Sequence, residues 1–296
     1  MKKIKRLTCL ILACQTLVFC SRDNETDSSS VEVKAENQRK IVKASSVDND
    51  DMMLGNPSEA NQEDYNNYLL GKENYTLSYN NKKGTPNWTS WHLDYRNLGS
   101  TSRANDFRAD TGLNGSFFLV SPTHYKDSGF DRGHMCPSAD RTNTFQANSE
   151  TFLMINMVPQ SPKNNQQTWE GLEECLRQFV RNDNKEVYII AGPYGQGGTG
   201  KNGGVTKFLA NGEICVPSST WKIAVILDEG NDDLTRIDEN TTIIAIDVPN
   251  NQNIDRDWKK YIVKVSDIEQ KTGFDFFSSM TSTLAKKLKA KTYSEK

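Results

Sequence analysis

The chain has 296 residues, enough for one large domain or two small ones. Its 36 Lys and Arg nearly balance its 38 Asp and Glu, for a formal net charge of −2 at pH 7. The chain therefore lacks the global basic field of proteins that bind nucleic acids tightly through charge alone, although a local basic cleft stays open.

The amino terminus has the pattern of an export signal. A basic start is followed by an apolar run that ends at Cys20 and is shorter than the ~20 residues that span a bilayer. We therefore expect residues 1–20 to be a signal peptide. Leu17 to Cys20 resembles a bacterial lipobox, which predicts a lipid on Cys20 and a membrane-anchored lipoprotein in the periplasm or at the cell surface. Phe19 departs from the small residue usual before that cysteine, so lipidation at Cys14 and ordinary secretion stay open as alternatives.

Residues 21–65 are rich in Ser, Asp, Glu, Asn and Lys and poor in aromatic residues. Such a composition buries too little apolar surface to offset the entropy cost of ordering. We expect a flexible polar tether there, followed by one globular domain over residues 66–290.

The domain contains Cys136, Cys175 and Cys215, whose spacing matches no zinc or redox motif. We interpret them first as small buried hydrophobic residues and second as the source of one disulfide, which export would permit.

Within the domain, β-branched and aromatic runs bounded by Gly, Pro, Asn and Asp predict strands. A Ser266–Glu269 capping pair and a stop at Gly273 help to predict the helices. Strands outnumber helices and do not alternate strictly with them, which favours an α+β fold with a mostly antiparallel central β-sheet flanked by helices. The expected strands are Trp88–Tyr95, Phe117–Ser121, Phe152–Val158, Val187–Ala191, Thr220–Leu227, Thr241–Val248 and Tyr261–Val265, and the expected helices are Gln166–Arg181, Ser266–Gly273 and Met280–Lys291.

Residues able to carry out chemistry first gather in the sequence Asp131-Arg132-Gly133-His134-Met135. A histidine has an unperturbed pKa of ~6.5 and can accept a proton from water near neutral pH. An arginine stays charged and matches the geometry of a phosphate. The glycine between them permits a close backbone approach. A base and a phosphate contact in one short stretch indicate phosphodiester hydrolysis.

The helix expected after Pro162 carries a polar stripe of residues four apart, beside an apolar stripe that would face a core. On its own, the polar stripe is most simply a solvated helix face with an ordinary ion pair. Together with the His134 motif and the intervening segment Asn156-Met157-Val158-Pro159-Gln160, it becomes a candidate functional face. The polar stripe consists of Asn165, Trp169, Glu173 and Arg177.

Taken together, these residues resemble the DNA/RNA non-specific endonucleases of the ββα-metal (His-Me finger) superfamily. Asp131 to His134 is similar to the signature motif, and Asn156 with Pro159 and Gln160 is similar to the strand and turn after it. Asn165 to Arg177 matches the metal-binding helix in order and spacing. The resemblance covers residues 66–290, most strongly residues 129–181, and implies a ββα-metal finger active site.

The resemblance implies a catalytic centre with one metal ion. His134 is the general base that activates water for attack on phosphorus. Asn165 is the only protein ligand of a Mg²⁺ ion, for which Mn²⁺ is an expected substitute. Glu173 orients the water molecules bound to the metal. Because a single neutral ligand leaves the charge of the ion available to the phosphate, a side chain must generate the nucleophile.

The resemblance also implies the groups around the phosphate. Arg132 and Arg177 contact the phosphate and stabilise its developing negative charge. Asn156 helps to shape the site around the histidine. An upstream arginine is implied as well, and Arg103 and Arg108 both lie in the matching neighbourhood.

Other residues that could bind phosphates, ions or bases have simpler structural interpretations. The stretch Gly195 to Asn202 resembles a phosphate-binding P-loop, but Asn202 replaces its Ser or Thr, so a Gly-rich loop after a strand is favoured. His92 and His124 lack catalytic partners nearby in the sequence. Trp88 and Trp91 could stack on bases, but core packing is the favoured interpretation.

We therefore predict an exported, Mg²⁺-dependent, sugar-non-specific endonuclease that hydrolyses DNA and RNA. Membrane contact is expected only through a lipid on Cys20, and a homodimer is a further expectation. A nucleic-acid-binding surface lipoprotein without catalysis and a phosphohydrolase acting on another anionic ester stay open as alternatives. An NTPase is a more remote one.

Overall fold

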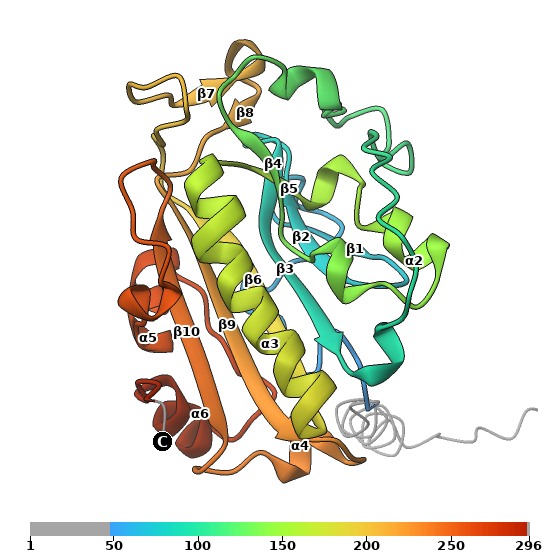
Figure 1. The fold of residues 1–296 in the computed structure, drawn as a ribbon, viewed down its shortest axis with the longest axis vertical. Helices are drawn as coiled ribbons and strands as arrows, with labels where there is room; N and C mark the ends of the chain where they lie inside the picture. Colours follow the sequence, from blue (N-terminus) through green and yellow to red (C-terminus); the bar gives the residue numbers. More distant parts are fainter. Residues whose placement is uncertain (1–47, 295–296) are drawn as a thin grey trace, which may run out of the picture. The chain divides into compact units, whose positions relative to one another are not determined.

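The computed structural model describes residues 48–294, and the expected signal peptide with Cys20 lies outside the described residues. A six-stranded sheet in the order β1-β2-β3-β6-β9-β10 forms its centre, and all neighbouring strands are antiparallel (Figure 1). This arrangement confirms the predicted α+β fold with an antiparallel central sheet. The central strands are β1 Tyr68–Gly71, β2 Thr76–Asn80, β3 Thr85–Leu93, β6 Lys185–Tyr194, β9 Ser219–Asp228 and β10 Thr242–Pro249; two short ladders pair β4 Asp131–His134 with β5 Met157–Gln160 and β7 Phe208–Leu209 with β8 Ile214–Cys215.

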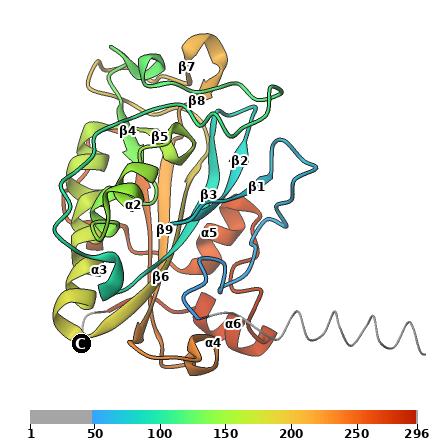
Figure 2. The ribbon, with the colours of Figure 1, turned by 90° about the vertical axis from the view of Figure 1, so that its right-hand side faces the viewer.

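Helices cover both faces of the central sheet (Figure 2). Alternate residues of β9 show the division, because successive side chains of a strand point to opposite faces. Ala224 and Ile226 pack in the core beneath α3, whereas Ile223 and Val225 pack in the core beneath α5 and α6. The helices are α2 Phe145–Glu150, α3 Glu170–Asp183, α4 Asp233–Arg236, α5 Val265–Thr272 and α6 Ser282–Lys289, and a π-helical turn, η5 Asn164–Trp169, precedes α3.

The helix ends agree with the sequence patterns to within a few residues. The expected helix Gln166–Arg181 is the π-helical turn η5 followed by α3, and its apolar stripe, including Leu172 and Leu176, is buried against the sheet. Helix α5 ends at Gly273, whose φ of 76° is left-handed, as predicted. Its start differs from the prediction, because Lys264 and Asp267 make the capping interaction in place of the expected Ser266 and Glu269.

Three of the expected strands are wrong in whole or in part. Phe117–Ser121 is not a strand, and Phe117 instead packs edge-on against the ring of Tyr68. Tyr261–Val265 contributes only one bridge, from Ile262 to Ile246, before α5 begins. In Phe152–Val158 a 3₁₀ turn precedes β5, which starts at Met157. Buried apolar residues in these runs satisfy tertiary packing, which the sequence pattern does not separate from sheet pairing.

Residues 48–65 belong to the folded domain, so the expected tether boundary at residue 65 lies too late. Met53 and Leu54 are buried in the core beneath α5 and α6. Asp51 accepts a hydrogen bond from the backbone nitrogen of His92 at 2.9 Å, and Ser58 accepts one from Nε1 of Trp88 at 2.8 Å. The segment is polar on average, so its composition did not reveal these few buried or hydrogen-bonded residues. They are enough to hold the segment against β3.

Cys136 and Cys215 are buried free thiols, in agreement with the first interpretation of the cysteines. Over residues 48–294, no helix combines the length and the apolar character needed to cross a bilayer.

Candidate active site

The Asp131–His134 motif forms strand β4, which runs antiparallel to β5. Asp131 lies opposite Gln160, and His134 lies opposite Met157. The packing between the strands requires a glycine at position 133, because a Cβ there would lie 1.9 Å from Oε1 of Gln160. The motif therefore forms a tight two-stranded ladder, and β4 lies beside the amino-terminal end of α3 (Figure 1).

Asn156 is fully buried just before β5 and holds the chain that follows His134. Its Oδ1 accepts a hydrogen bond from the backbone nitrogen of Cys136 at 3.0 Å, and its Nδ2 donates to the carbonyl oxygen of Cys136 at 2.8 Å. A further bond runs from Nδ2 to the carbonyl oxygen of Thr151 at 3.0 Å. These bonds fix the backbone close to His134, and the role of Asn156 in shaping the site stays a prediction.

A pair of side-chain contacts joins the β4–β5 ladder to the helix. Asn165 lies in the π-helical turn η5, a kind of helix distortion that is frequent at functional sites. Its Nδ2 donates a hydrogen bond to Oδ2 of Asp131 at 2.8 Å, and Nε2 of Gln166 donates to the same oxygen at 2.7 Å. Because the nitrogen of the Asn165 amide is engaged, its Oδ1 remains as the end that can ligate a cation.

His134 packs against the rings of Phe107 and Phe152, with ring centroids 5.5 and 4.9 Å away. Its Nε2 is buried, and among the described residues it has no hydrogen-bond partner. Burial, reinforced by the charges of Arg103 and Arg132, lowers the pKa of His134 to about 3. The imidazole is therefore neutral at physiological pH, with a ring nitrogen free to accept a proton.

Two arginines stack on the same pair of phenylalanines. The guanidinium carbon of Arg132 lies 3.9 Å from the ring centroid of Phe107, and that of Arg103 lies 4.7 Å from the ring centroid of Phe152. Arg108, in contrast, pairs with Asp106 at 2.8 Å and donates to a backbone carbonyl. Arg103 therefore lies on a ring that packs against His134, whereas Arg108 is held by Asp106 and Ser149.

An open groove of about 570 Å³ lies beside these residues. Its charged lining consists of Arg103, Lys126 and Arg132 against the single carboxylate of Asp131, so its local charge is positive although the whole chain is slightly acidic. This is the local basic cleft that the composition left open. His134 does not line the groove itself, but Phe107, which packs on its ring, does. The other lining residues are Asn105, Pro122, Thr123, Tyr125, Phe130, Asn165 and Gln166.

Glu173 and Arg177 lie deeper than the resemblance implied. Arg177 is 3 % exposed, and its Nη1 donates to Oδ1 of Asp140 at 2.9 Å. An arginine held in a buried ion pair is not placed to contact a phosphate directly. The position of Arg177 therefore does not match the phosphate contact that the resemblance implies. Oε1 of Glu173 accepts a hydrogen bond from Nζ of Lys222 at 3.0 Å. Burial raises the pKa of Glu173, and the charges of Lys222 and Arg177 oppose that rise.

Comparisons with known proteins decide the family. The sequence profile of the DNA/RNA non-specific endonucleases matches residues 55–283. The chain belongs to this family. It is 44 % identical over 242 residues to a nuclease of Nostoc sp., a match that covers 81 % of this chain and 85 % of the relative. It is 30 % identical over 243 residues to nuclease C1 of Cunninghamella echinulata, covering 79 % of this chain and 90 % of the relative.

A solved structure shows the same fold. EndoG in the crystal structure of the EndoG/EndoGI complex matches with a TM-score of 0.64 and 24 % identity, over 79 % of this chain and 92 % of that chain. As a member of the family, the chain is an endonuclease that acts on nucleic acids. The family match begins at residue 55, which agrees with the packing of residues 48–65 into the domain.

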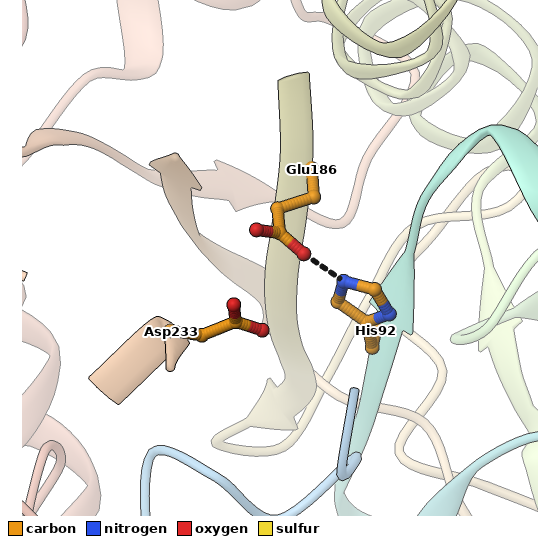
Figure 3. A group of neighbouring side chains, drawn as sticks. All are labelled: His92, Glu186 and Asp233. Carbon is orange, nitrogen blue, oxygen red and sulfur yellow. Dashed lines mark hydrogen bonds and ion pairs between the residues drawn. The ribbon is translucent and has the colours of Figure 1, made fainter. Parts of the chain in front are cut away.

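The family is one of metal-dependent nucleases, and this endonuclease holds a second group with metal-like spacing (Figure 3). One ligand atom each from His92, Glu186 and Asp233 lie within 4.8 Å of one another. However, Arg236 contacts both Glu186 and Asp233, and the hydroxyl of Tyr188 donates to Asp233. A cation would have to displace Arg236, so we interpret the group as a buried ion-pair network.

Sequence reasoning missed Lys222 and Phe107 in this endonuclease. Lys222 stands beside the apolar run 223–227 of strand β9 and points to the core beneath α3, which is a signal that could have found it. A buried ammonium group requires a partner, and the nearest chemistry-bearing residues were on the expected helix. Phe107 lies in an irregular segment and carries no comparable signal.

Proposed function

We propose that this endonuclease depends on Mg²⁺ and hydrolyses phosphodiester bonds of both DNA and RNA, with His134 as the general base and Asn165 as the only protein ligand of the ion. The observation that carries the proposal is the 2.8 Å hydrogen bond from Nδ2 of Asn165 to Oδ2 of Asp131. It ties the helix that would hold the ion to the strand that carries His134. One phosphate in the groove could thus meet both groups.

The residues at the η5 turn fit a Mg²⁺ ion, and they would also accept Mn²⁺. Mg²⁺ prefers oxygen ligands and keeps several of its waters. Asn165 offers one amide oxygen, because its nitrogen is occupied by Asp131. When bound, the ion would stabilise the negative charge that develops on the phosphate and on the leaving oxygen. With a single neutral protein ligand, we expect weak affinity for the ion in the absence of substrate.

His134 would take the proton of the attacking water. This role needs the neutral imidazole, which burial and the two nearby arginines secure. A base with a pKa of about 3 is weak, but a phosphodiester in the groove would offset the charges of Arg103 and Arg132. We therefore expect substrate binding to raise the pKa of His134 toward the working pH, where a general base is most effective.

Arg103 and Arg132 would bind the phosphate. Each guanidinium lies over a phenylalanine ring, which fixes its plane. Nη1 of Arg103 donates a hydrogen bond to Oγ of Ser138 at 2.6 Å, and its other N–H groups would serve phosphate oxygens. Such contacts address the backbone, which DNA and RNA share, so low sequence and sugar preference follows. Glu173 would orient a metal-bound water, and Arg177 would act through Glu173 and Asp140, with no direct contact to the phosphate.

The proposal is tested by digesting plasmid DNA and a long RNA with the wild type and with His134→Ala, each with Mg²⁺ and with a chelator. We expect the wild type to degrade both substrates only with Mg²⁺, and the variant to lose nearly all activity while its circular dichroism spectrum is unchanged. Equal activity of the two folded proteins would contradict the assignment of the base. Binding without cleavage by the wild type would favour the non-catalytic alternative, and hydrolysis of other phosphate esters alone would favour the phosphohydrolase.

We further propose that the chain is exported and lipid-anchored at Cys20, on the strength of the basic and apolar pattern of residues 1–20. The test is metabolic labelling with a radioactive fatty acid in a bacterial host. We expect label on the wild type and none on Cys20→Ala, with Cys14→Ala as the matched control that keeps its label. Unlabelled wild type found in the medium would show ordinary secretion.

A further inference from the structure

Lys222 is a fully buried lysine that touches the helix of the active site. It is 0 % exposed, and its Nζ lies 3.0 Å from Oε1 of Glu173. The same nitrogen lies 4.1 Å from the ring centroid of Trp169 and 5.7 Å from that of Trp91. A buried ammonium group is strongly unfavourable unless it is paired, and here a carboxylate and aromatic faces compensate it. The lysine therefore has a defined place between β9 and α3.

We propose that Lys222 is a positioning residue for the nuclease reaction: it holds the carboxylate of Glu173 ionised and in one orientation, so that Oε2 remains to accept a hydrogen bond from a metal-bound water. The inference rests on the proposed role of Glu173. It adds a residue from the central sheet, far along the chain from the ββα motif, to the machinery of the site.

Strand β9 also fixes the turn that carries the expected metal ligand. Thr220, two residues before Lys222 and on the same face of the strand, accepts a hydrogen bond at 2.9 Å from Nδ2 of Asn164. Asn164 is the neighbour of Asn165. Two side chains of one strand thus contact the helix at the metal-ligand turn and at Glu173. Because both contacts come from a central strand, they anchor the η5 turn and the first turn of α3 to the sheet.

The charges around Glu173 give Lys222 the leading electrostatic role. The groups that face this carboxylate are Lys222 from β9, Arg177 from α3, Asp140 from the turn after β4, and Arg103 from the groove. Burial raises the pKa of Glu173, and Lys222 is the strongest opposing influence, ahead of Arg177. Burial lowers the pKa of Lys222 in turn, and Glu173 opposes that fall. Loss of the lysine would therefore favour a protonated Glu173.

The test is a double-mutant cycle of kcat/KM on plasmid DNA with the wild type, Lys222→Met, Glu173→Gln and the double variant. We expect Lys222→Met to lower kcat/KM by about 10–100-fold, the range typical for partners of metal-site groups. In the Glu173→Gln background the same change should have no further effect, because the group through which Lys222 acts is gone. Lys185→Met removes a partly exposed lysine of the neighbouring strand, paired with Asp228, and serves as the control with wild-type activity.

The pH profile separates positioning from a general structural effect. Lys222→Met should move the acid limb of kcat/KM to higher pH, since Glu173 then needs a higher pH to ionise. Glu173→Gln should show no such movement when Lys222 is changed. Should Lys222→Met fail to fold, Lys222→Gln keeps a hydrogen-bond donor without the charge and should show the same movement.

Two kinds of failure are distinguishable. Inactive wild type, or active His134→Ala, overturns the proposed function itself. If those two results stand, the inference alone is overturned by an equal loss from Lys222→Met in both backgrounds, or by an acid limb that does not move.

Discussion

Two buried histidines of this endonuclease differ in the sign of the charged groups around them. Nε2 of His92 lies 3.0 Å from Oε2 of Glu186, and its Nδ1 lies 3.9 Å from Oδ2 of Asp94. His134 has Arg103 and Arg132 as its charged neighbours, and Nε2 lacks a hydrogen-bond partner in the part of the chain that the structure describes. The two sites contain the same side chain at a similar degree of burial, 4 % and 8 % exposed.

The difference shows why burial and metal-like spacing do not identify a reactive histidine. Glu186 and Asp233 lie beside His92 (Figure 3). Arg236 contacts both carboxylates and Tyr188 donates to Asp233, so this group is already engaged within the protein. Nε2 of His134 is buried without a hydrogen-bond partner among the described residues, and the ring packs on Phe107, which lines a positive groove. Unused hydrogen-bonding capacity near a groove whose charge is complementary to a phosphate is the basis for proposing His134 as the reactive histidine.

The sharpest way to break this comparison is to make the same substitution in both histidines. His134→Gln should lower kcat/KM on plasmid DNA by ~10²–10⁴-fold, because a general base is removed. His92→Gln should leave kcat/KM of the folded protein near that of the wild type, because the His92 network contains no proposed substrate group. Steady-state kinetics with Mg²⁺ measures both. A comparable loss of activity in the two variants would erase the distinction.

The two upstream arginines offer a second matched pair. Arg103→Ala should lower kcat/KM by roughly 10–100-fold, which corresponds to the loss of one charge-assisted hydrogen bond to the phosphate. Arg108→Ala should change it little, since Arg108 pairs with Asp106 outside the groove. If Arg108→Ala proved the more damaging change in folded protein, the assignment of Arg103 to the site would be mistaken.

Stability should follow the opposite order from activity. His92→Gln should lower the free energy of unfolding by about 1–3 kcal/mol, the penalty for leaving a buried polar group without its partner. His134→Gln should lower it less, because Nε2 of His134 makes no hydrogen bond to another described residue. Urea denaturation of both variants at pH 8 measures the difference, and a larger loss for His134→Gln would contradict the account of its surroundings.

A further expected effect is a pH dependence of stability that belongs to His134. Its pKa is about 3 in the folded protein and ~6.5 when unfolded, so the unfolded chain binds an extra proton between these values. The stabilisation is complete above pH ~6.5 and is lost as the pH falls toward the folded pKa.

His134→Gln should therefore lose less stability than the wild type between pH 6.5 and 4 in the same denaturation experiment. Asp51, whose pKa burial raises to about 6, contributes with the opposite sign in an overlapping window, but it is common to both proteins. The difference between the two curves isolates His134, and parallel curves would show that its folded pKa is not lowered.

The antiparallel sheet, the helix after Pro162 and the order of the catalytic motif were all predictable from the chain alone. Each of them depends on residues close in sequence: β-branched runs for the strands, a repeat of four for the polar stripe, and Gly133 for a close strand pairing. Phe117–Ser121 was predicted wrongly as a strand, because an apolar run looks the same whether it pairs in a sheet or packs from a loop.

The choice between Arg103 and Arg108 was open in the sequence, since both lie within a few residues of each other. Only the folded chain shows which of them shares the groove with Arg132, and only the fold buries Arg177 against Asp140. Lys222 could be recognised as a partner of Glu173 once β9 was placed under α3.

The sequence by itself determined which chemical groups this nuclease has and the short-range order that sets them on a strand and a helix. The tertiary structure decided which of those groups remain open to a substrate and which neutralise one another in the interior. The physical reason is that secondary structure follows from local spacing, whereas the charge state and accessibility of a side chain depend on neighbours that folding brings from distant parts of the chain.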